Sequence, residues 1–239
     1  MVRRLAIVLS ILLLPSLAFA KEKVTKAEWD GLYRIYKLRA NLAQHGEAAR
    51  ISAELAAKYP DQKKIQIFCG RTAYFYAHRL EGKKQQKAAE RGVECAQRVL
   101  DKNPKDYDGR LMWAMTLFKS KAGEGWQSAL KESKNIKKFL EDMIKDEPKR
   151  FEAYMMLGAL YRDLPGIISW GDSAKGMELL EKGGKLNPHD PDMLLELAQG
   201  YAAVGKKEKA RATYRKCINE SKSPKDMEWE TEDARQYAK

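Results

Sequence analysis

Apolar residues recur every three or four positions along most of this chain, in pairs of segments that are separated by turn residues. The clearest pair spans residues 191–217. On its first segment Leu197, Ala198 and Tyr201 share one helical face, and Gly205 then ends the helix. The second segment resumes the same spacing at Ala210, Tyr214 and Cys217. This pattern predicts two short amphipathic helices folded into a hairpin.

The same pairing recurs along the rest of the chain, while β-branched runs, which would favour buried sheet, are scarce after the first 20 residues. We therefore predict an all-α fold. The predicted elements are about five helical hairpins at residues 26–60, 62–104, 106–148, 150–188 and 190–222, and a C-terminal capping helix at 226–238. In the first two hairpins the turns are expected at His45–Gly46 and at residues 81–86.

The 191–217 hairpin resembles a tetratricopeptide repeat (TPR). The signature of that repeat is a large residue, Leu, a small residue and Tyr on helix A, then Gly, then Ala, an aromatic and a small residue on helix B. One such hairpin cannot bury its own apolar face, so neighbouring hairpins must stack on it. The resemblance implies a right-handed α-solenoid over residues 21–239, in which the A helices line a concave groove that receives a partner segment. Carried onto this chain, the groove positions of the family fall on Tyr74, His78, Met115, Lys119, Arg162 and Gln199.

The fourth hairpin contains an insertion. The interval from Gly158 to Gly176 is six residues longer than the family pattern requires, and the extra residues fall at 165–170. Pro165 ends the first helix, and Asp172 is expected to cap the next one.

Two interpretations of the apolar residues in this insertion, Ile167, Ile168 and Trp170, remain open. In the first, they fold back over the end of the hairpin, and each burial contributes about 1.5 to 3 kcal/mol of transfer free energy. In the second, they form a lip beside the groove that anchors a partner, because Trp is enriched at binding hot spots.

The first 20 residues are typical of a secretory signal peptide. Two arginines precede an apolar run at residues 5–14, and Ala18-Phe19-Ala20 forms a small-x-small cleavage site. We expect cleavage near Ala20 and a periplasmic or secreted mature chain. The apolar run is short for a membrane span and no Cys near the cut offers a lipid attachment site, so a transmembrane segment is not expected in the mature chain. The alternative is an uncleaved N-terminal anchor.

Basic residues outnumber acidic ones, by 45 to 33, which gives a net charge of +12. Loss of the two arginines of the signal peptide would leave +10. In an exported protein this charge favours another protein as the partner, acidic or envelope-associated, and argues against nucleic acid. The simpler alternative is that the lysines only solvate the outer helix faces. The sequence does not indicate the oligomeric state.

Two of the three cysteines, Cys69 and Cys95, lie nearly opposite each other if the second hairpin turns at residues 81–86. A disulfide between them would close a loop of about 26 residues and stabilise the fold by roughly 3.5 kcal/mol in the chain-entropy model. The alternative is that both are buried thiols that act as small apolar residues. Cys217 occupies a small core position of its repeat, and we expect it to be a buried thiol.

The sequence contains no recognisable catalytic motif. Its three histidines, His45, His78 and His189, are far apart, and the spacings HExxH, CxxC, GxSxG and the P-loop are absent. The carboxylates lie among lysines at the spacing of solvated helix faces. We therefore expect a protein that is not an enzyme and that has no metal site and no cofactor.

These observations favour a periplasmic scaffold that binds a partner segment in a TPR groove. The chain also resembles the T component of TRAP transporters, an exported helical-repeat protein that works beside a solute-binding protein. That resemblance implies a transport helper that binds a solute-binding protein or a small apolar ligand. An apolar pocket without a partner groove would favour this alternative. A third possibility is a cell-envelope assembly factor that is recruited by charge. Salt would weaken its binding, because salt screens exposed charges.

Overall fold

The computed structural model describes residues 23–37 and 42–220, and the secondary structure of this part of the chain is entirely helical. The helices are α1 (Lys26–Lys37), α2 (Leu42–Lys58), α3 (Lys63–His78), α4 (Gly82–Lys102), α5 (Tyr107–Glu124), α6 (Trp126–Asp146), α7 (Phe151–Asp163), α8 (Ser173–Leu186), α9 (Pro191–Ala203) and α10 (Lys207–Glu220). The predicted all-α fold of stacked helical hairpins is confirmed. None of these helices is long and apolar enough to cross a membrane.

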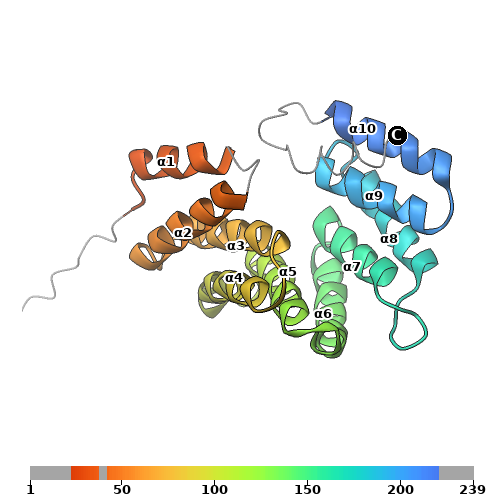
Figure 1. The fold of residues 1–239 in the computed structure, drawn as a ribbon, viewed down its shortest axis with the longest axis horizontal. Helices are drawn as coiled ribbons and strands as arrows, with labels where there is room; N and C mark the ends of the chain where they lie inside the picture. The colour runs from red at the N-terminus through yellow and green to blue at the C-terminus, as the bar shows by residue number, and fades with distance from the viewer. Residues whose placement is uncertain (1–22, 38–41, 221–239) are drawn as a thin grey trace, which may run out of the picture.

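The helices form a stack in which each one packs on the next along the chain, and the stack curves into an open arc (Figure 1). The first helices of successive hairpins also touch one another, because α3 packs on α5, α5 on α7 and α7 on α9. These four helices therefore make a continuous inner layer of the arc.

Three aspartates begin helices of this stack by capping them. Asp106 accepts a hydrogen bond from the backbone N–H of Gly109, Asp190 from that of Met193, and Asp172 from two backbone N–H groups at the start of α8. Each cap satisfies donors that have no partner inside the helix. The cap predicted at Asp172 is present.

Two of the predicted turns were wrong. Helix α2 begins at Leu42, so His45 and Gly46 lie inside it, and α4 begins at Gly82, so the hairpin turns at residues 79–81. Lysine and glutamine, which fill positions 83–86, are good helix formers, and their polarity alone does not make a turn. Gly46 serves close packing instead, because a Cβ there would lie 3.2 Å from the ring of Tyr76 on α3.

The insertion leaves the packing of the fourth hairpin unchanged. The linker at residues 164–172 is six residues longer than the linker at 204–206 in the fifth hairpin. Gly158 and Gly176 nevertheless lie against each other, because a Cβ on Gly176 would come within 2.7 Å of the carbonyl oxygen of Gly158. The extra residues are therefore accommodated in the loop, and α7 and α8 keep their close contact.

The second hairpin is cross-linked. Cys69 on α3 and Cys95 on α4 form a disulfide with a Cα–Cα distance of 6.1 Å, and both side chains are buried. Cys217 is also buried, and its thiol donates a hydrogen bond to the carbonyl oxygen of Pro191. The signal peptide at 1–20 and the capping helix at 226–238 lie outside the described residues.

Candidate functional site

The inner layer of the arc contains two adjoining cavities, of about 370 Å³ and about 200 Å³. Side chains from α3, α5, α7 and α9 line both of them. The cavities share four lining residues, namely Tyr74, Met115, Leu195 and Glu196. We therefore treat them as one groove with a larger and a smaller part.

All six positions that the TPR resemblance assigned to the groove line the smaller part. They are Tyr74, His78, Met115, Lys119, Arg162 and Gln199. They come together because α3, α5, α7 and α9 turn equivalent faces inward. Tyr74 and Met115 also line the larger part.

A hydrogen-bonded network forms the floor of the smaller part. Arg162 on α7 donates from Nη1 to the Glu196 carboxylate on α9 at 2.7 Å and to the Glu196 carbonyl oxygen at 3.2 Å. Its Nη2 donates to Asp163 at 2.9 Å. Burial raises the pKa of Glu196, while the nearby Arg162 acts in the opposite direction. The network therefore joins α7 to α9 beneath the groove.

Lys119 on α5 brings a second cation to this floor. Its ammonium lies 5.9 Å from the centre of the Tyr74 ring, and burial lowers its pKa. Within residues 23–37 and 42–220, no carboxylate lies within ion-pair distance of this ammonium, although Glu196 and Asp163 are close enough to act on its pKa.

The larger part of the groove has apolar walls made of flexible and aromatic side chains. Met112 on α5 and Met155 on α7 face it, together with Phe75 on α3 and Phe151 on α7. Methionine side chains adapt their shape to a partner more readily than branched ones do. These walls suit large apolar side chains of varied shape.

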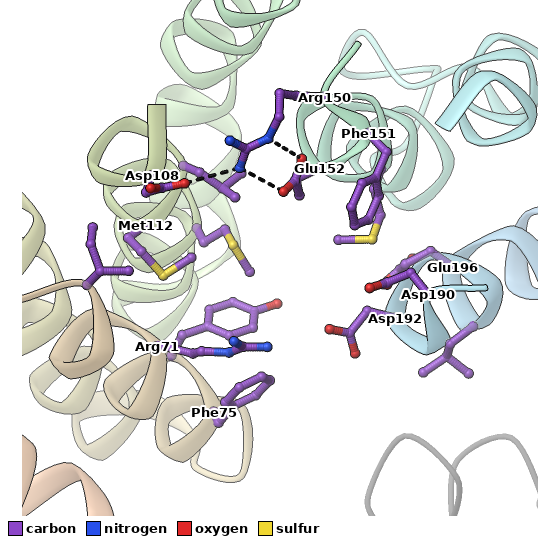
Figure 2. A pocket seen from close by; sticks show the side chains of 16 residues that line it. Arg71, Phe75, Asp108, Met112, Arg150, Phe151, Glu152, Asp190, Asp192 and Glu196 are labelled. Carbon is purple, nitrogen blue, oxygen red and sulfur yellow. Dashed lines mark hydrogen bonds and ion pairs between the residues drawn. The ribbon is translucent and has the colours of Figure 1, made fainter. Parts of the chain in front are cut away.

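An arginine-centred network closes one side of the larger part. The Nη2 group of Arg150, just before α7, donates to Asp108 at 3.1 Å and to Glu152 at 2.8 Å (Figure 2). The guanidinium carbon also lies 4.0 Å from the centre of the Tyr107 ring. This network fixes the start of α7 against α5.

The opposite side of the larger part is acidic. Asp190, Asp192 and Glu196 approach it from α9 and from the cap of α9, and they face Arg71 and Phe75 on α3 across the cavity (Figure 2). Burial raises the pKa of Asp190, although the hydrogen bond that its carboxylate accepts from the Met193 N–H and the charge of Arg71 oppose this.

The insertion loop lies apart from the groove, and no residue of 164–172 lines either part of it. Trp170 folds back, because its ring packs edge-on against Tyr161 at 4.7 Å and its Nε1 donates to Ser133 Oγ at 3.0 Å. Ile167 and Ile168 are 99% and 63% exposed and cover nothing. The two interpretations of the loop thus separate: Trp170 closes the hairpin, and the two isoleucines project into solvent.

Sequence reasoning missed Arg71, Met112, Glu196 and Asp192. The first three lie one helical turn before the predicted positions Tyr74, Met115 and Gln199, and Asp192 lies two turns before Gln199. The signal was therefore present, because residues at i−3 and i−7 share a helix face. Among the described residues, no group of three His, Cys, Asp or Glu side chains is arranged to hold a metal ion.

Comparison with solved structures identifies the fold. The chain is similar to TTC0263, a thermophilic TPR protein from Thermus thermophilus, with 16% identity and a TM-score of 0.62 over 87% of this chain and 99% of that one. It is also similar to MamA (41-end) from Desulfovibrio magneticus RS-1, with 17% identity and a TM-score of 0.43 over 84% and 100%. No protein-family model and no curated protein sequence matches the chain. The fold is a TPR-like solenoid.

Proposed function

We propose that this protein is a non-enzymatic periplasmic scaffold, and that its groove binds a segment of a partner protein. One observation carries the proposal: α3, α5, α7 and α9 converge on two cavities that share lining residues and together span four successive hairpins. Helical or extended segments are commonly recognised in grooves of this kind.

The groove is organised before any partner binds. Arg150 holds Asp108 of α5 and Arg162 holds Glu196 of α9 through hydrogen bonds of 3.1 and 2.7 Å. A wall that is already ordered pays less conformational entropy when a ligand binds. The apolar side chains of the larger part then supply the burial that drives association.

The shape of the groove bears on the transport-helper alternative. A volume of about 370 Å³ falls within the range of small-molecule pockets. However, the lining includes five carboxylates and two guanidinium groups, and the cavity continues into a second one. A pocket for a small apolar ligand would be less charged and self-contained, so these features favour a partner segment.

Two further features support export. The first 20 residues have the pattern of a signal peptide. The Cys69–Cys95 disulfide is the kind of bond that persists in oxidising compartments. The proposed location is therefore the periplasm or the exterior of the cell.

The test is a pull-down from periplasmic extract with the purified protein and with two single variants. Met115→Arg places a charged side chain where both parts of the groove meet. Trp126→Arg makes the same kind of change at a side chain that is 63% exposed and outside both cavities. Circular dichroism and thermal unfolding establish that both variants are folded.

We expect a protein that the wild type and Trp126→Arg retain and that Met115→Arg loses. Retention of the same proteins by all three would show that binding does not use the groove. Loss by both variants would indicate a surface outside it.

A further inference from the structure

The larger part of the groove has a charge opposite in sign to that of the whole protein. Its lining contains the five carboxylates of Asp108, Glu152, Asp190, Asp192 and Glu196 and the two guanidinium groups of Arg71 and Arg150. The full chain, by contrast, carries a net charge of +12. Net charge therefore does not describe what the groove presents to a ligand.

The wall itself neutralises part of this negative charge. Arg150 binds both Asp108 and Glu152 (Figure 2), and Asp108 also forms an ion pair of 2.9 Å with Lys63 on α3. The cations of Arg150 and Lys63 thus offset these two carboxylates and join α5 to α7 and to α3.

The remaining three carboxylates gather on the α9 side. Glu196 accepts a hydrogen bond from Arg162, while Asp190 and Asp192 face Arg71 across the cavity (Figure 2). Burial raises the pKa of both Asp190 and Glu196, which indicates that the surrounding cations do not fully offset the desolvation of these carboxylates. A further positive charge at this wall would be favourable.

Apolar side chains of the same cavity lie across from this wall and beside it. Phe75 on α3 and Met112 on α5 lie across from it (Figure 2), and Met155 lines the cavity from α7, which packs on α9. A ligand in the cavity thus meets an acidic wall and an apolar wall at the same time.

We propose that the groove selects a partner segment in which a Lys or Arg side chain lies beside a large apolar side chain. The cation contacts the carboxylates of Asp190 and Asp192, and the apolar side chain packs on Phe75, Met112 and Met155. This inference rests on the proposed function and adds the chemistry of the partner. An acidic segment would bring like charges together at the α9 wall, so an acidic partner of the kind favoured by net charge would have to contact the outer surface.

The first experiment selects binders from a random peptide display library with the purified protein as bait. We expect the selected peptides to be enriched in Lys or Arg next to Leu, Met, Phe or Trp, relative to the unselected library. One selected peptide is then labelled, and its dissociation constant is measured by fluorescence anisotropy.

The second experiment repeats the titration with variants. Asp190→Asn/Asp192→Asn removes two charges from the α9 wall, and Asn at position 190 still caps the helix. Glu94→Gln/Glu178→Gln removes two charges from exposed positions on α4 and α8, outside the groove. We expect about tenfold weaker binding to the first double variant, the scale of one charge-assisted hydrogen bond, and no change for the second.

The outcomes separate this inference from the proposed function. Selected peptides without basic residues, or equal affinity for both double variants, would overturn the inference and leave groove binding intact. A library from which no peptide is enriched would overturn both.

Discussion

The contact between Arg162 and Glu196 provides the sharpest test of how the groove is held together. The Arg162 side chain is only 9% exposed, and it donates two hydrogen bonds to Glu196 on the neighbouring hairpin. Replacing Arg162 by Met keeps much of the apolar stem and removes every donor. The Glu196 carboxylate then loses its ionic partner while it stays largely buried.

The magnitude follows from the exposure of the two partners. Removing one member of a fully buried ion pair costs about 3 to 5 kcal/mol, whereas an exposed pair is worth about 0 to 1 kcal/mol. Glu196 is 29% exposed, so water reaches it in part, and we expect a loss of about 2 kcal/mol in the free energy of unfolding. Asp163, the other partner of Arg162, is 59% exposed and regains water at little cost.

The assay is urea unfolding followed by far-ultraviolet circular dichroism, with the m-value monitored for changes in cooperativity. The double variant Arg162→Met/Glu196→Leu should recover more than half of the loss, because no carboxylate is left stranded. Arg50→Met, which breaks only exposed pairs on α2, is the matched control and should cost less than about 1 kcal/mol. A loss below about 0.5 kcal/mol for Arg162→Met, or strictly additive single effects, would refute the reasoning.

Three further predictions concern packing, the cross-link and pH. Gly176→Ala should lower the free energy of unfolding by about 1 to 2 kcal/mol, because its Cβ would meet the Gly158 carbonyl oxygen at 2.7 Å. Gly31→Ala has open space around its Cβ and should raise the free energy of unfolding by about 0.5 to 1 kcal/mol. The urea midpoints of the two variants distinguish the cases. Reducing and alkylating the α3–α4 disulfide should cost about 3.5 kcal/mol for its sequence separation of 26 residues, and an unchanged urea midpoint would contradict this. Burial raises the pKa of Asp190 and of Glu196 above their ordinary values of 3.8 and 4.5, so both lose charge at a higher pH than exposed carboxyls do. The affinity of a basic peptide should therefore fall in anisotropy titrations as the pH is lowered from 7 toward the raised pKa values of these two carboxyls. The affinity of an uncharged analogue should stay constant.

The hairpins and the inward-facing helix positions were predictable because both depend on local periodicity. Leu157, Gly158 and Tyr161 carry the repeat signature, and the structure places all three in the buried face of α7. The six groove positions converge for the same reason, since equivalent turns of successive A helices face one another.

What could not be predicted depends on contacts between hairpins. The polar run at residues 81–86 suggested a turn, yet it begins α4, because tertiary packing and helix propensity outweigh polarity. The direction of Trp170 was open because its hydrogen-bond partner, Ser133, lies 37 residues earlier in the chain. The acidic character of the α9 wall could not be read from the net charge of +12, because that number sums the charges of the whole chain and not those of the groove lining.

Because the hairpins are stacked, the width of the groove depends on the sum of the rotations between successive hairpins. Helices α3 and α9 face each other across the larger cavity, yet three steps of the stack separate their hairpins. A small rotation at any interface between them is therefore multiplied by a lever arm before it reaches the cavity. Substitutions buried between hairpins, such as those at Gly183 on α8 or Gly200 on α9, should change the affinity for a partner without contacting it. Selectivity therefore depends on the packing between hairpins as well as on the residues that line the groove.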